Sequence, residues 1–124
     1  MDKLRIGVIG VCGRGGIANH WHNNKRSEVV AGADVSEAAL ADFRTRMGED
    51  VFTTLEYRSL LDRPDVDAVA VTAPDFMHEE LACAALEAGK HVFCEKPLAI
   101  STAGCDRILR TWQASGKHLM VGFN

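Results

Sequence analysis

Short apolar runs alternate with helical patterns along this sequence, and that alternation restricts its possible folds more than any other feature. Strand-like runs are expected at 4–9, 29–34, 51–53, 68–72, 91–94 and 118–123. Helical patterns lie between them, including segments at 17–25 and 76–88 and the stripe Leu40, Phe43 and Met47 behind the N-capping Ser36. Strands separated by helices and short loops indicate βαβ units. We therefore predict an α/β fold with a doubly wound, parallel six-stranded sheet in the order 3-2-1-4-5-6, formed by one domain over residues 1–124.

Composition argues against several classes of protein. Lys and Arg number 14 against 17 Asp and Glu, and there is no basic run, which argues against nucleic acid or a membrane surface as a partner. No stretch approaches the roughly 20 apolar residues that a bilayer span needs. Four cysteines without a Cys-x-x-Cys pair predict reduced, structural thiols, no metal site and a cytoplasmic protein.

A glycine-rich loop, GVCGRGG, follows the first predicted strand and opens a helix. In such a loop the backbone approaches a pyrophosphate closely, and the helix N-terminus directs N–H groups at it. Gly10 and Gly15 match the first and third glycines of the G-x-G-x-x-G fingerprint, but Cys12 stands at the second, with Gly13 one residue later. We predict that Cys12 weakens dinucleotide binding without abolishing it. Arg14 either pairs with a phosphate or is solvated.

Asp34 ends the second predicted strand. A carboxylate at this place can accept hydrogen bonds from both hydroxyls of the adenosine ribose, and it repels a 2′-phosphate. The nearest basic residues after it are Arg44 and Arg46, so NAD is expected to be preferred over NADP. The alternative is that Asp34 caps the following helix.

Three later segments carry a resemblance to a known family. They are DAVAVTAPDFMH at 67–78, ALEAGKHV at 85–92 and CEKPLA at 94–99. Together they resemble the N-terminal half of the Gfo/Idh/MocA oxidoreductases, and the terminal VGFN is similar to the family's junction into a second domain. The resemblance runs along the whole chain, and Glu-Lys-Pro after the fifth strand is its most specific element. It implies an NAD(P)-dependent enzyme that interconverts an alcohol and a ketone or aldehyde on a sugar or cyclic polyol by hydride transfer.

The resemblance also implies roles for individual residues. Glu95 would contact the ribose on the nicotinamide side, and Lys96 would face the nicotinamide and the substrate as the catalytic residue of this chain. An ammonium group there stabilises charge that develops on the substrate oxygen. His78 would begin a helix near the cofactor, either contacting it or serving as a cap or packing residue. The residues that would pass under the cofactor after the fourth strand are Thr72, Ala73 and Pro74.

Members of the family carry a second, C-terminal α/β domain, which supplies substrate contacts and most of the oligomer interface. This sequence contains none of that domain. The chain is therefore expected to bind the cofactor with little turnover and to expose an apolar surface, and a full-length form is expected to be a homo-oligomer. Two alternatives stay open, a non-catalytic dinucleotide-sensing module and an NAD-dependent glycosidase of the same family.

Overall fold

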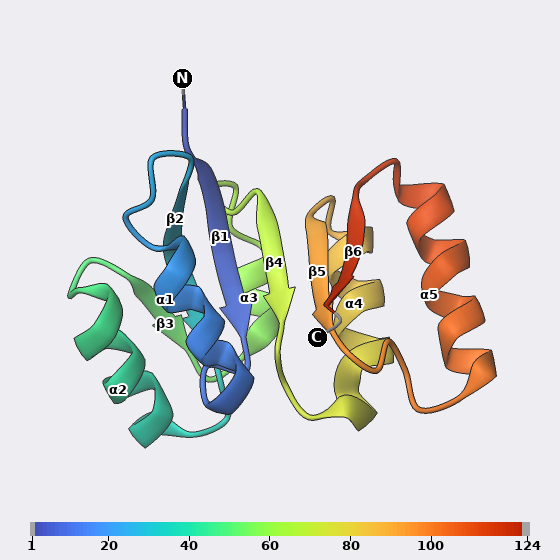
Figure 1. Ribbon diagram of the computed structural model, residues 1–124, viewed down its shortest axis with the longest axis horizontal. Helices are drawn as coiled ribbons and strands as arrows, with labels where there is room; N and C mark the ends of the chain where they lie inside the picture. Colours follow the sequence, from blue (N-terminus) through green and yellow to red (C-terminus); the bar gives the residue numbers. More distant parts are fainter. Residues whose placement is uncertain (1, 123–124) are drawn as a thin grey trace.

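The computed structural model describes residues 2–122, which form one parallel sheet with helices on both faces (Figure 1). The strand order is β3-β2-β1-β4-β5-β6, as predicted. Every neighbouring pair of strands is parallel. The strands are β1 (Leu4–Ile9), β2 (Ser27–Ala33), β3 (Phe52–Thr54), β4 (Ala68–Val71), β5 (His91–Glu95) and β6 (Leu119–Gly122). The order reverses between β1 and β4, and ligands of such sheets bind beyond the carboxyl ends of the strands at this point.

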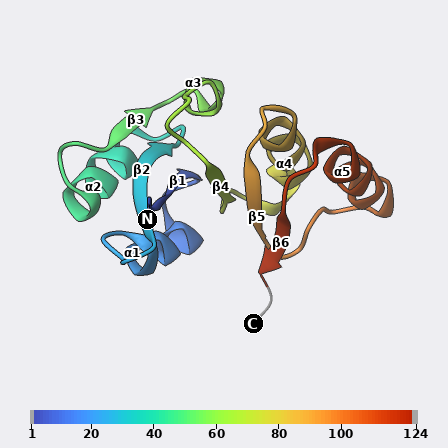
Figure 2. The ribbon, with the colours of Figure 1, turned by 90° about the horizontal axis from the view of Figure 1, so that it is seen from above.

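The helices divide between the two faces of the sheet (Figure 2). Two apolar clusters, one on each face, make up the core. β1, β2 and β4 contribute buried residues to both clusters, and they read as nearly continuous apolar runs because both of their faces are buried. The first face carries the 3-10 helix η1 (Gly13–Ile17), α1 (Ala18–Trp21) and α2 (Glu37–Met47). The second carries α3 (Tyr57–Leu61), α4 (His78–Glu87), which the 3-10 turn η2 (Asp75–Met77) precedes, and α5 (Thr102–Ser115).

The first helix is shorter than the sequence pattern predicts. A helix over 17–25 was expected, but a 3-10 turn begins at Gly13 and the α-helix ends at Trp21. The chain becomes extended at His22, and Asn23 then adopts a φ of 57°. Other boundaries differ by one or two residues, as in β2, which spans Ser27–Ala33 where 29–34 was expected. The helix expected at 76–88 starts as a 3-10 turn, β3 lies one residue later than expected, and the end of the strand expected at 118–123 lies outside the described residues.

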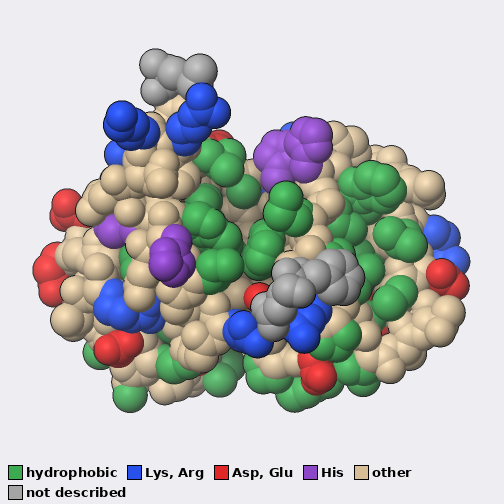
Figure 3. Space-filling view, viewed as in Figure 1, with side chains coloured by type: hydrophobic (Ala, Val, Ile, Leu, Met, Phe, Trp, Pro, Cys, Tyr) green, Lys and Arg blue, Asp and Glu red, His purple; other side chains and the backbone are tan. Residues whose placement is uncertain are grey.

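One end of the sheet is covered on one face only. Among the described residues, no helix lies over β5 and β6 on the side of α1 (Figure 2). Apolar side chains gather on this face (Figure 3). Phe93 there packs edge-on against Trp21, with 5.4 Å between ring centroids, and Met120 is 64% exposed. No helix within residues 2–122 combines the length and the apolar character that crossing a membrane requires.

Candidate functional site

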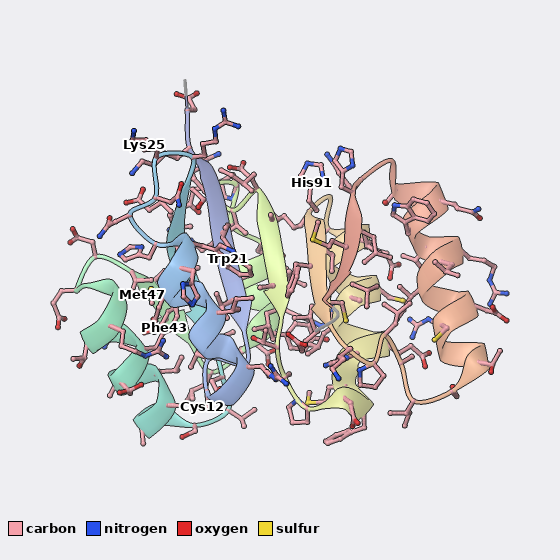
Figure 4. All side chains as sticks on the ribbon, viewed as in Figure 1. Cys12, Trp21, Lys25, Phe43, Met47 and His91 are labelled. Carbon is pink, nitrogen blue, oxygen red and sulfur yellow. The ribbon has the colours of Figure 1, made fainter. Side chains whose placement is uncertain are left out.

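The predicted site residues come together at one edge of the sheet, where the strands end, with the labelled Cys12 marking this edge (Figure 4). This edge also contains the switch point between β1 and β4. The residues are Gly10, Cys12, Gly13, Arg14 and Gly15 after β1, Asp34 after β2, Thr72, Ala73 and Pro74 after β4, His78 at the start of α4, Glu95 at the end of β5, and Lys96 after it.

Two glycines of the loop are required by their surroundings. Gly10 has a φ of +88°, and a Cβ on it would lie 2.5 Å from the backbone nitrogen of Ala73. A Cβ on Gly15 would lie 2.5 Å from the carbonyl oxygen of Gly10. Cys12, by contrast, has φ −90° and ψ 168°, an extended conformation open to any residue, and its side chain is exposed. The loop itself therefore needs glycine at the first and third fingerprint positions but not at the second.

Hydrogen bonds from neighbouring strands hold the first residues of the loop. The N–H of Gly10 donates to the carbonyl of Ala33 at 2.9 Å, and the hydroxyl of Thr72 donates to the carbonyl of Gly10 at 2.6 Å. The N–H of Val11 donates to Oδ2 of Asp34 at 3.0 Å. The Thr72 hydroxyl thus fastens the loop to β4, and Asp34 fastens it to β2.

The next residues of the loop leave their donors free. Within residues 2–122, the backbone N–H groups of Cys12, Gly13 and Arg14 have no hydrogen-bond partner. They lie at the beginning of η1, and the exposed guanidinium of Arg14 adds a positive charge beside them. Consecutive free N–H groups with a neighbouring cation suit an anion such as a pyrophosphate.

The carboxylate of Asp34 is held in a fixed orientation. Its Oδ2 accepts from Val11, and its Oδ1 accepts from the N–H of Ser36 at 3.0 Å. Each oxygen can still accept one further hydrogen bond, which leaves room for two ribose hydroxyls. The alternative that Asp34 caps α2 is wrong, because Ser36 is the N-cap of this helix and its hydroxyl accepts the N–H of Ala39 at 3.2 Å.

Asp34 lies at the rim of an apolar cleft, which the sequence reasoning found only in part. Val35 and Leu55, directly after β2 and β3, are 86% and 50% exposed. An apolar residue just past the end of a strand at this edge is the signal that could have identified them. The cleft suits a flat aromatic group such as an adenine. It is lined by Ile9, Gly10, Ala33, Asp34, Val35, Leu55, Tyr57, Ala73, Pro74, Met77 and Leu81.

His78 joins two loops of the site. Its side chain is buried, with Nε2 lying 2.9 Å from the carbonyl oxygen of Ala73 and Nδ1 lying 2.6 Å from that of Pro97. Both ring nitrogens are thus engaged by protein carbonyls. This geometry favours the packing role of His78 over a direct cofactor contact, and the contact itself stays a prediction.

Glu95 and Lys96 lie together at the end of β5. The carboxylate of Glu95 is largely buried, and among the described residues its Oε1 accepts one hydrogen bond, from the N–H of Lys96 at 3.4 Å. Glu95 and Arg14 line one groove beside the glycine loop. The side chain of Lys96 is exposed, and its Nζ has no hydrogen bond or ion pair with any described residue. A carboxylate with free lone pairs can accept from a hydroxyl, and an exposed ammonium can donate a proton.

The structure contains free thiols and, among the described residues, no group of side chains that could bind a metal ion. Cys12, Cys83, Cys94 and Cys105 are free thiols. Burial, followed by the nearby Glu95 carboxylate, raises the pKa of Cys94 to about 12, so this thiol is unreactive at neutral pH. Within residues 2–122, no three His, Cys, Asp or Glu side chains are grouped closely enough to hold a metal ion.

Comparison with known proteins agrees with this geometry. The family model described as an oxidoreductase family with an NAD-binding Rossmann fold matches residues 4–123. An inositol 2-dehydrogenase of Pseudomonas fluorescens (strain SBW25) is 40% identical over an alignment of 124 positions, which covers 98% of this chain and 37% of that protein. The chain therefore spans little more than a third of the curated relatives that it matches.

Solved structures show the same partial coverage. A probable dehydrogenase from Thermotoga maritima superposes with a TM-score of 0.90 at 34% identity, covering 96% of this chain and 36% of that one. A 3-ketoreductase from Actinomadura kijaniata, solved in complex with NADP and TDP-benzene, gives a TM-score of 0.88 at 33% identity, covering 98% of this chain and 37% of that one.

Proposed function

Because the chain belongs to the Gfo/Idh/MocA family of oxidoreductases, we propose that it is the nucleotide-binding part of an NAD(P)-dependent dehydrogenase. The reaction is the interconversion of an alcohol and a ketone or aldehyde. The observation that carries the proposal is the continuous arrangement along one edge of three features: the free loop N–H groups, the fixed Asp34 carboxylate and the apolar cleft. An extended dinucleotide presents phosphates, ribose hydroxyls and an adenine in that order.

Each part of the edge has its own task in binding. The N–H groups of Cys12, Gly13 and Arg14 hold the pyrophosphate, and Asp34 accepts hydrogen bonds from the adenosine ribose. On the other side of the loop, Glu95 accepts from the second ribose. When bound, the dinucleotide supplies a ring carbon that accepts or returns a hydride.

Lys96 contributes the chain's own part of the chemistry. Its exposed Nζ holds a proton next to the place where the substrate oxygen would lie. An ammonium there stabilises the negative charge that develops on that oxygen during oxidation and returns a proton during reduction. A free lysine at this position favours a dehydrogenase over a dinucleotide sensor, which has no use for a proton donor.

The substrate class and the cofactor preference are part of the same proposal. Relatives named inositol 2-dehydrogenase support a cyclic polyol or sugar as the substrate. The fixed negative charge of Asp34 supports NAD over NADP, because it repels a 2′-phosphate. One relative was solved in complex with NADP, so the preference for NAD has to be measured.

Calorimetric titration of the chain with NADH and with NADPH tests the proposal. We expect a micromolar dissociation constant for NADH, about −8 kcal/mol, and an affinity for NADPH at least about tenfold weaker. Asp34→Asn should narrow that difference, with Asp42→Asn on the exposed face of α2 as the control. Preference for NADPH would refute the role of Asp34. No binding of either dinucleotide by the folded chain would refute the proposal.

The proposal also covers the oligomeric state of the protein and the cell compartment in which it functions. The apolar face of β5 and β6, where Met120 is exposed, supports a homo-oligomeric longer form, because exposed apolar patches mark contact surfaces. Four free thiols support a reducing compartment such as the cytoplasm. Gel filtration and fractionation of cells that produce the longer protein would test both points.

A further inference from the structure

The side chain of Arg46 reaches the glycine loop from α2, which lies outside the sequence motif. Its Nη2 donates to the carbonyl of Val11 at 3.0 Å, and its Nη1 donates to Oδ1 of Asn19 at 2.9 Å. Its Nε donates to Oδ2 of Asp42 at 3.0 Å. The guanidinium carbon also lies 5.6 Å from the centroid of the Phe43 ring. Four contacts from three elements therefore restrain one side chain, which is only 24% exposed.

The peptide groups of Val11 are held from two sides. Its N–H donates to Asp34, and its carbonyl accepts from Arg46. Val11 itself is fully buried, so its side chain cannot turn without disturbing the core. The Val11 carbonyl belongs to the same peptide plane as the N–H of Cys12, one of the free donors of the loop. The direction of that carbonyl therefore sets the direction of the Cys12 N–H.

We propose that Arg46 is a positioning residue of the dinucleotide site. Through the Val11 carbonyl it aims the Cys12 N–H at the pyrophosphate, and through the same residue it keeps the loop against the ribose-binding Asp34. This inference rests on the proposed function. A bond from a charged donor is stronger than a bond between neutral groups, and it keeps its geometry better.

The composition of the loop explains why an outside anchor is needed. Gly13 adopts a φ of +55°, and no atom lies within 4 Å of where its Cβ would be, so packing does not restrain this part of the loop. Cys12 makes no side-chain hydrogen bond to cap η1. The Gly13 N–H is directed by the Cys12 carbonyl, which accepts from the N–H of Gly15 at 2.9 Å, whereas the direction of the Cys12 N–H depends on the anchors on Gly10 and Val11.

The first experiment needs no nucleotide. Amide hydrogen exchange at Val11 and Cys12 is compared by NMR in the wild-type chain, Arg46→Met and Arg46→Lys. Asp42→Asn is the matched control, because it removes one Arg46 contact and leaves the bond to Val11. We expect exchange at Val11 at least about tenfold faster in Arg46→Met, while exchange at Val69 in the core of β4 stays unchanged. Unchanged exchange at Val11 would overturn the inference.

The second experiment measures NADH affinity of the same variants by calorimetry. Arg46→Met should weaken binding by about tenfold, or about 1.4 kcal/mol. Arg46→Lys keeps a single charged donor and should recover binding to within about threefold of wild type. Asp42→Asn should bind as wild type does. Normal affinity in Arg46→Met, despite faster exchange, would overturn the positioning role and leave the proposed function intact. If the wild-type chain binds no dinucleotide, the proposed function fails and the positioning role fails with it, while the exchange rates still report whether Arg46 holds the loop.

Discussion

Two adjacent glycines at the start of the first helix differ sharply in their surroundings. A Cβ on Gly15 would meet the carbonyl of Gly10 at 2.5 Å, whereas a Cβ on Gly16 would meet nothing within 4 Å. We predict that Gly15→Ala displaces the loop and weakens NADH binding by about tenfold or more, which corresponds to about 1.4 kcal/mol. Gly16→Ala should keep the affinity and raise the free energy of unfolding by up to about 1 kcal/mol, because alanine loses less backbone entropy. Calorimetry and urea unfolding of both variants test this, and equal losses of affinity would contradict it.

His78 makes a second prediction at the residue scale. His78→Ala leaves the carbonyls of Ala73 and Pro97 without their partner and opens a cavity beneath the site. We expect the free energy of unfolding to fall by about 2–5 kcal/mol. His20→Ala, on the exposed side of α1, should change it by no more than about 0.5 kcal/mol. Urea unfolding at pH 7 measures both, and a His78 variant as stable as the His20 variant would show that the two carbonyls do not depend on the imidazole.

The residues that sequence reasoning could find differ from those it missed in a simple physical way. Gly10 and Gly15 belong to a glycine motif that follows the first predicted strand, and Asp34 ends the second, so their positions along the chain were enough to identify them. Arg46 acts on a carbonyl 35 residues away. Its contact depends on how α2 packs against the loop, and no spacing along the chain encodes that packing. Partners brought together by tertiary structure alone therefore had to come from the structure.

At the scale of the elements, the residue that precedes the edge strand β6 is held by a hydrogen bond whose acceptor, the imidazole of His91, can be protonated. Nδ1 of His91, at the amino end of β5 (Figure 4), accepts the N–H of His118 at 3.0 Å, and the two rings lie 5.1 Å apart. Burial, then the positive charges of His118 and Lys117, lower the pKa of His91, against a smaller opposite effect of Asp67. A protonated Nδ1 cannot accept this bond. The folded chain therefore holds neutral His91, and the unfolded chain takes up the proton more readily.

Stability should consequently fall as the pH drops below the ordinary histidine pKa of about 6.5. We predict a lower urea midpoint at pH 5.5 than at pH 7.5 for the wild-type chain. The difference should shrink in His91→Asn, whose side-chain oxygen accepts the N–H without titrating. His20→Asn serves as the control and should keep the wild-type difference. If His91→Asn keeps it too, the histidine contact does not contribute to the pH dependence.

The bounds of the helices and strands also show which parts of the fold the local sequence determines. The buried strands were predicted to within two residues at either end, because strands covered on both faces must be continuously apolar. The helix predicted at 17–25 was too long because Ile17 and Trp21 have helical spacing. The helix ends at Trp21, and the extended His22 and the positive φ of Asn23 follow from the path of the chain back to β2. A helix boundary set by the route of the chain has no periodic signal.

At the scale of the whole molecule, the sheet presents two neighbouring surfaces. Dinucleotide-binding groups occupy the carboxyl edge, and an apolar face lies over β5 and β6 (Figure 3). The two surfaces meet at the groove that Arg14, Glu95 and Met120 line. Met120 is 64% exposed on that face, and Leu109 is 42% exposed on α5, on the opposite side of the sheet. An exposed apolar patch favours association between copies. We predict concentration-dependent self-association of the chain, measurable by sedimentation velocity.

Met120→Lys should shift the chain toward monomer, because the ammonium would have to be desolvated in any contact across this face. Leu109→Lys, a matched substitution on the other side, should leave the association unchanged. NADH affinity should stay the same in Leu109→Lys, because Leu109 lies on the opposite side of the sheet from the groove that Met120 shares with Glu95 and Arg14. If both substitutions shift the chain toward monomer equally, the added charge and not the face of Met120 controls the association. A loss of NADH affinity in Met120→Lys alone would instead mean that the groove shared by Met120, Glu95 and Arg14 takes part in binding, so that the face and the edge act as one surface.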